Sequence, residues 1–65
     1  MLTILEARHR TGLSRKRAAV FLGVTEQTVY RWETGRTQVK RFHLAALADL
    51  YGVRPEDLGT NGQAV

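Results

Sequence analysis

Three consecutive cations, Arg15, Lys16 and Arg17, follow Ser14, a residue type that favours the N-cap of a helix. Cations in the first turn of a helix oppose its dipole, at a cost of about 0.3–1 kcal/mol each at low salt. A glutamate at position 17 would complete a capping box with Ser14, but an arginine stands there. Such a local conflict often marks a functional site, and cations beside the N–H groups of a helix start can bind phosphates. The alternative is a solvated basic turn that only aids solubility.

A second basic group follows the helix expected over residues 26–34, in a loop that contains no proline. Its cationic and polar members are Arg36, Thr37, Gln38, Lys40 and Arg41. We expect this loop to bind phosphates as well, on the side opposite to the first basic group. A plain solvated loop is the alternative.

The two basic groups flank a helix-turn-helix pattern over residues 14–35. Ser14 and Thr25 can each cap a helix by accepting a hydrogen bond from an unpaired backbone N–H. Gly23 stands where the first helix must stop, a place that often needs positive φ, and Gly35 ends the second helix in the same way. Small and apolar residues would join the two helices: Ala18, Ala19, Leu22, Val24, Val29 and Trp32. Such a unit lays one helix across the edges of DNA bases.

The composition agrees with a small DNA-binding domain. Sixty-five residues suffice for one domain with a modest core, and a hydrophobic fraction of 43% is ordinary for a globular chain. Ten Lys or Arg against six Asp or Glu give a net charge of +4, which suits a polyanionic partner.

Other classes of function find little support in the sequence. No pattern of nucleophile, base and acid or of a phosphate-binding glycine loop is present, so we expect no enzyme and no cofactor. His9 and His43 lack acidic or thiol neighbours at ligand spacing, which argues against a metal site. The chain shows no cysteine, signal peptide or long apolar segment, so we expect a cytoplasmic protein with no membrane partner. It also shows no ligand or cleavage domain, so we expect no small-molecule effector.

The expected fold is all-α, with five short helices, no strand and a frayed tail. Residues 44, 47, 48 and 51 repeat at three- and four-residue intervals, typical of a helix stripe that faces the core. Pro55 suits the first position of a short last helix. The helices are expected over residues 2–10, 14–22, 26–34, from after residue 41 to residue 51, and 54–58. Residues 1–58 would form the domain and residues 59–65 a flexible tail.

The order of these residues resembles the lambda-repressor-like helix-turn-helix family, also called the Cro/CI type or XRE. The resemblance covers roughly residues 2 to 58. It implies a compact five-helix domain that binds palindromic operators as a dimer, with its third helix in the major groove. The motifs that carry it are Gly12-Leu13-Ser14, Ala19, Leu22-Gly23-Val24, Thr28-Val29, Arg31-Trp32-Glu33-Thr34-Gly35-Arg36 and Leu44-x-x-Leu47-Ala48.

The resemblance also implies which residues read bases. In such domains the readers lie on the exposed face at the start of the third helix, where this chain has Glu26, Gln27, Tyr30 and Arg31. Gln can pair bidentately with adenine, Arg with guanine O6 and N7, and Glu can accept from cytosine or sit at the positive helix end. Tyr30 departs from the small or polar residue often found there and would pack on a thymine methyl or sugar, or lie on the surface. Thr28 would start the helix or contact a phosphate.

Further roles follow from the same resemblance. Arg15 occupies the position that the family uses to contact phosphate. Arg8 and Glu33 match positions that form an internal ion pair in some relatives. Relatives of this size often dimerise through the region that here holds Tyr51, Val53, Pro55 and Leu58, so we expect a weak dimer that DNA strengthens.

Three apolar residues remain. Trp32 has core spacing and is expected to be a buried anchor, not a stacking platform. Val20 and Phe21 are more apolar than an exposed face requires. They could form a small partner patch, but we expect a partly covered edge of the core.

Two functions remain open. The first is a small Cro-like transcriptional regulator, of phage or plasmid type, that represses by binding a pseudo-palindromic operator. The second is a protein-interaction adaptor or antitoxin-like module with the same fold. Cations on both sides of the third helix favour DNA.

Overall fold

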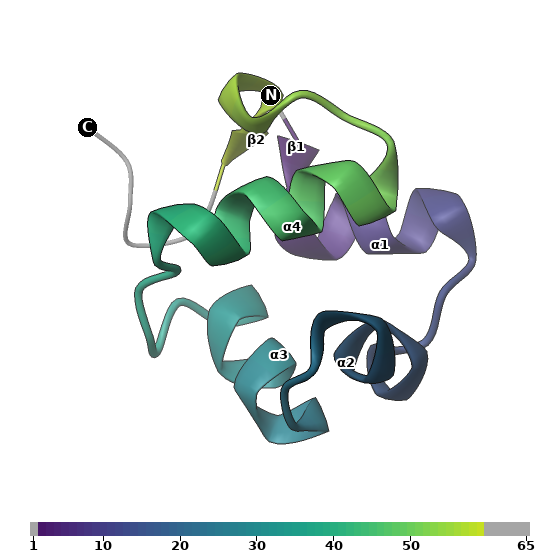
Figure 1. The fold of residues 1–65 in the computed structure, drawn as a ribbon, viewed down its shortest axis with the longest axis vertical. Coiled ribbons are helices and arrows are strands. Elements are labelled where there is room, and N and C mark those ends of the chain that lie inside the picture. The colour runs from purple at the N-terminus through teal and green to yellow at the C-terminus, as the bar shows by residue number, and fades with distance from the viewer. Residues whose placement is uncertain (1, 60–65) are drawn as a thin grey trace.

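The computed structural model describes residues 2–59, and these form a small helical domain (Figure 1). Within them lie four α-helices, one 3-10 turn and two very short strands. In chain order they are β1 (Leu2–Thr3), α1 (Ile4–Thr11), α2 (Arg15–Leu22), α3 (Glu26–Glu33), α4 (Arg41–Tyr51), the 3-10 turn (Pro55–Asp57) and β2 (Leu58–Gly59). Of the predicted tail, residues 60–65 lie outside the described part.

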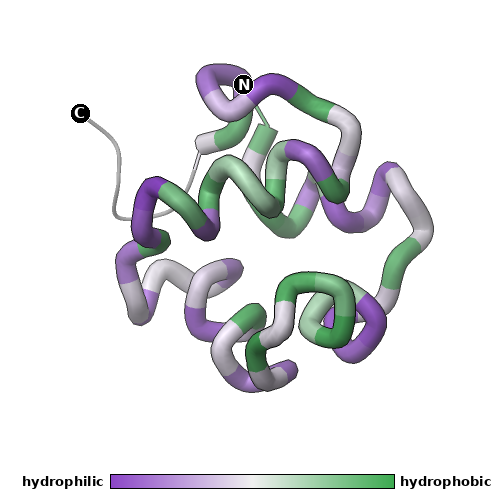
Figure 2. Tube along the Cα trace, viewed as in Figure 1, coloured by the Kyte–Doolittle hydropathy of each residue, from purple (hydrophilic) through white to green (hydrophobic). Residues whose placement is uncertain are grey.

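The helices form two packed pairs around one core. Helices α2 and α3 form the helix-turn-helix, and α4 crosses above them beside α1 (Figure 1). Hydrophilic and hydrophobic residues alternate along the helices, as expected when one face of each helix is buried (Figure 2). The core residues are Ile4, Ala7, Ala18, Ala19, Val29, Trp32, Val39, Leu47, Ala48, Tyr51 and Leu58. The expected burial of Trp32 is confirmed, since it is 3% exposed.

The helix-turn-helix has the predicted start and stop signals. The side chains of Ser14 and Thr25 accept hydrogen bonds from the N–H groups of Arg17 and Thr28, three residues on. Gly23 ends α2 with φ +72°, in the left-handed region where a residue with a side chain is strained. The turn therefore depends on glycine for its backbone conformation and on the two hydroxyls for its helix starts.

The first helix starts two residues later than the sequence analysis predicted. Thr3 caps α1 in a capping box, in which its hydroxyl accepts from the N–H of Glu6 and the Glu6 carboxylate accepts from the N–H of Thr3. These hydrogen bonds hold the pKa of Glu6 below its usual value. The Thr3-x-x-Glu6 spacing is a known helix-start signal, so this boundary was available from the sequence.

Of the expected fifth helix only a 3-10 turn forms, with Pro55 at its start as predicted, and the expectation of no strand was wrong. Pro55–Asp57 form a single 3-10 turn, and the chain then extends so that Leu58 and Gly59 pair in parallel with Leu2 and Thr3. The extension buries Leu58, which is 4% exposed. A longer helix would give up this pairing and turn the Leu58 side chain away from its place in the core.

A buried ion pair joins α1 to the end of α3, as the resemblance to the family implied. Nε of Arg8 donates to Oε2 of Glu33 at 2.5 Å, and Nη2 of Arg8 donates to Oε1 at 3.3 Å. Nη1 of Arg8 also donates to the carbonyl oxygen of Leu13 at 2.9 Å. The Arg8 and Glu33 side chains are only 10% and 4% exposed, so neither charge has much water to replace its partner.

We expect the two charges to be strongly coupled in stability. Loss of one partner from a buried pair lowers the free energy of unfolding by about 3–5 kcal/mol, because the other charge stays buried without a partner. Glu33→Ala should therefore destabilise the wild-type domain far more than it destabilises the Arg8→Ala variant. Urea unfolding of the two single variants and the double variant measures the coupling, and additive losses would contradict it.

Tyr51 carries a buried hydroxyl beside this ion pair. Within residues 2–59 that hydroxyl has no hydrogen-bond partner, and the residue is 5% exposed. Burial and the nearby negative charge of Glu33 raise the pKa of Tyr51 to about 12, while the positive charge of Arg8 lowers it. The folded domain thus favours the neutral phenol.

This shift predicts a loss of stability at high pH. The unfolded chain ionises Tyr51 near pH 10 and the folded chain only near pH 12, so the contribution is complete below pH 10 and is lost between about pH 10 and 12. Tyr51→Phe should lose less stability over that interval. The measurement is the difference between the two proteins in thermal unfolding as the pH is raised, because effects common to both proteins cancel in that difference. If the wild type and Tyr51→Phe lose stability equally over that interval, the ionisation of Tyr51 is not responsible for the loss.

Candidate nucleic-acid interface

Helix α3 divides its residues between the core and solvent. Val29 and Trp32 point inward, with exposures of 0% and 3%. The four predicted base readers, on the opposite side, are all exposed: Glu26, Gln27, Tyr30 and Arg31. The buried face fixes the rotation of the helix, so the polar face is presented without any rearrangement of the core.

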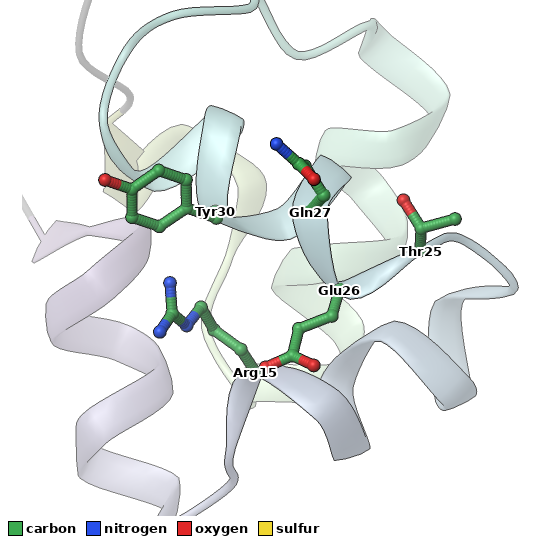
Figure 3. A pocket seen from close by; sticks show the side chains of 5 residues that line it. All are labelled: Arg15, Thr25, Glu26, Gln27 and Tyr30. Carbon is green, nitrogen blue, oxygen red and sulfur yellow. The ribbon is translucent and has the colours of Figure 1, made fainter.

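The N-terminal ends of α2 and α3 meet in an open pocket. It is lined by Arg15, Thr25, Glu26, Gln27 and Tyr30 (Figure 3). Three predicted readers thus lie together with the predicted phosphate contact Arg15. Arg31 does not line this pocket.

Arg15 reaches across from α2 to α3. Its guanidinium carbon lies over the ring of Tyr30, 5.0 Å from the ring centre, and its side chain points toward that ring in Figure 3. A cation at this distance from an aromatic face is attracted by the ring quadrupole. The sequence analysis treated these two residues separately and missed their contact, since nothing in a linear sequence shows which rotamers face each other.

Lys16 and Arg17 lie away from Arg15, although the three are consecutive. They line a second groove, together with Ser14, Val20 and Phe21. The expectation that Val20 and Phe21 belong to the edge of the core was wrong, because they are 75% and 66% exposed. Ala18 and Ala19 fill the inward face of α2, which turns residues 20 and 21 outward.

Thr28 takes part in the N-terminal cap of α3. Its N–H donates to the Thr25 hydroxyl at 3.1 Å, and the two hydroxyls lie 2.8 Å apart. The side chain is partly buried. A phosphate contact by Thr28 therefore stays a prediction that would have to share this hydroxyl.

The basic loop after α3 is anchored at both ends. The N–H groups of Arg36 and Thr37 donate to the carbonyl oxygen of Arg31 at 2.9 and 3.4 Å, and Val39 is buried in the core. The five residues predicted to bind phosphates here are all exposed: Arg36, Thr37, Gln38 and Lys40 in the loop and Arg41 at the start of α4. The role of Val39 as an anchor was missed, because one apolar residue in a polar segment has no periodic pattern.

Two aromatic contacts extend the core beyond the end of α3. The ring of His43 lies 4.9 Å from Trp32 and 4.1 Å from Phe42, measured between ring centres. Phe42 itself is 66% exposed. Together with Val39, the contact of His43 with Trp32 holds the basic loop between α3 and α4.

Two of the four expected dimer contacts are not on the surface. Tyr51 and Leu58 lie in the core, since α4 turns Tyr51 inward and the strand pairing buries Leu58. Val53 is partly exposed and Pro55 is exposed. This region therefore offers a second copy less apolar surface than the sequence analysis expected.

Residues 2–59 contain no group of three or more His, Asp or Glu side chains placed to hold a metal ion. No helix in this part of the chain combines the length and the apolar character that a membrane span needs.

Comparison with known protein families agrees with this geometry. The family of the helix-turn-helix domain matches residues 4–59, which includes all four α-helices and both basic groups. Comparison with curated proteins and with solved structures gave no significant match. The family match and the exposed polar face of α3 both point to DNA as the partner and to transcription regulation as the field of action. The chain belongs to the helix-turn-helix domain family.

Proposed function

We propose that this protein is a sequence-specific regulator of transcription that binds double-stranded DNA with α3 in the major groove. The observation that carries the proposal is the exposed face of α3, whose side chains Gln27 and Arg31 match the edges of adenine and guanine. Arg15 at the start of α2 and the cations of the loop after α3 would hold the phosphates on either side. Contacts of the first kind select a sequence, and contacts of the second kind fix the position of the domain.

The regulator would act as a pair of copies on a pseudo-palindromic operator. A single α3 reads only a few base pairs, and two copies with half-site centres one helical turn apart (~34 Å) double the sequence that is read. Val53 and Pro55 are the candidate contacts that remain at the surface, and so small an area supports only a weak dimer that DNA strengthens. Bound in this way, the protein would repress by blocking access to a promoter, as a Cro-like protein of phage or plasmid type does.

A protein-interaction module is the second candidate, and the groove on α2 is the observation that favours it. Val20 and Phe21 are exposed beside Lys16 and Arg17, and α2 has no acidic residue in its first turn. This surface would suit an acidic segment that carries an apolar side chain. We prefer the first candidate for two reasons. The cations of the loop after α3 do not line this groove. The exposed side chains of α3 suit base reading and would not be needed to bind such a partner.

Selection from random DNA separates the two candidates. The purified protein is mixed with a pool of random duplexes near physiological salt, and the retained duplexes are sequenced. We expect an enriched motif with two-fold symmetry. Retention without a motif would point to an architectural role, and no retention would favour the protein-interaction module.

Two substitutions test the division between base reading and phosphate binding. Arg31→Ala should relax the preference at one base pair in each half-site and cost about 1–3 kcal/mol of binding free energy on the selected sequence. Arg15→Ala should weaken binding to every duplex and reduce the slope of log K against log salt by about one unit.

Arg10→Ala is the matched control, since Arg10 is an exposed cation at the end of α1, outside both basic groups. Its salt slope should stay close to that of the wild type. If Arg31→Ala and Arg15→Ala both weaken all duplexes alike, the division between readers and phosphate contacts is wrong.

A further inference from the structure

We infer that Tyr30 is a positioning residue that holds Arg15 ready to bind a DNA phosphate, an inference that rests on the proposed DNA-binding function. The guanidinium of Arg15 lies over the Tyr30 ring at 5.0 Å. The two residues belong to different helices and face the same open pocket (Figure 3). Tyr30 thus has a role that differs from the base reading implied by the family resemblance.

The ring restrains Arg15 without using its hydrogen-bond donors. Within residues 2–59, the Arg15 side chain forms no ion pair and donates no hydrogen bond to an oxygen. Attraction to an aromatic face leaves the N–H groups of a guanidinium free for the planar, two-point contact that phosphate accepts. Arg8 shows the opposite arrangement, since its donors are taken by Glu33 and Leu13.

The restraint has a use in binding because a free arginine side chain must be ordered when it meets a phosphate. An immobilised rotamer-rich side chain carries an entropic cost, which is smaller when the side chain is already held. Arg15 is only partly exposed, as expected of a side chain that lies against a neighbouring ring. Converted to affinity, the restraint corresponds to roughly a two- to tenfold effect.

The contact also keeps Arg15 away from a competing anion. Glu26 lines the same pocket, and Figure 3 shows its carboxylate descending from α3 toward α2. An Arg15 released by the ring could pair with that carboxylate, which would occupy the donors intended for phosphate. The ring belongs to α3 and Arg15 belongs to α2. Their contact therefore also couples the phosphate-binding side chain of α2 to α3, the helix that we propose to read bases.

A double-variant cycle on DNA binding tests this role. Binding to one random-sequence duplex is measured at several salt concentrations for wild type, Tyr30→Leu, Arg15→Gln and the double variant. Tyr30→Leu should bind this duplex roughly two- to tenfold more weakly, whereas it should add little in the Arg15→Gln background. Tyr30→Phe keeps the ring and should bind as the wild type does.

The alternative roles of Tyr30 give different results. If Tyr30 only reads bases, Tyr30→Leu leaves binding to the random duplex unchanged and reduces binding to the selected operator, with the same loss in the Arg15→Gln background. Unchanged binding to the random duplex, or an equal loss in the wild-type and Arg15→Gln backgrounds, overturns the inference while the proposed function stands. A wild-type protein that binds no duplex would overturn the proposed function and this inference together.

A measurement on the free protein tests the contact apart from DNA. Protons of a side chain that lies over an aromatic ring are shifted upfield in the NMR spectrum. The Hδ protons of Arg15 should show this shift in the wild type and in Tyr30→Phe, and should lose it in Tyr30→Leu. Identical Arg15 shifts in all three proteins would overturn the inference, and unfolding curves for each variant show that the fold is kept.

Discussion

The ion pair between Arg8 and Glu33 connects the helix-turn-helix to α1, the helix that packs behind it. Glu33 is the last residue of α3, and Arg8 lies on α1, so their contact fixes the far end of α3 against a different helix. Arg8 also holds the carbonyl of Leu13, directly before the cap of α2. One buried side chain thereby contacts the end of α3 and the segment that leads into α2. A small core with few large residues gains orientation from such a contact more than it gains net stability.

With its end fixed, α3 can divide its two faces between structure and recognition. Val29 and Trp32 are buried in the core, and the exposed positions hold the side chains that we propose to hydrogen-bond to bases. The helix-turn-helix family matches residues 4–59, which include the whole of α3. At the junction of α2 and α3, Arg15 lies over the ring of Tyr30.

Local signals predicted most of the fold from the sequence. Ser14, Thr25 and Gly23 mark the boundaries of the helix-turn-helix because each has a physical reason to stand at a helix end. The errors came from long-range effects. Pairing of residues 58–59 with residues 2–3 replaced the fifth helix, and a strand of two residues has no periodicity to reveal it. The site shows the same difference between local and long-range effects. The exposed face of α3 could be predicted from the spacing of its apolar residues. The outward turn of Val20 and Phe21 and the contact of Arg15 with Tyr30 could not, because they depend on how the helices pack.

The most direct test of the account is to map the surface that touches DNA. Amide NMR spectra of the isotope-labelled protein are recorded as a duplex from the random-sequence selection is added. We predict that the largest shift changes fall on the first turn of α2, on α3 and on residues 36–41 in the loop and at the start of α4, while the outer face of α1 is unchanged. Changes centred on Val20 and Phe21, with α3 unaffected, would contradict the claim that α3 is the DNA-reading element.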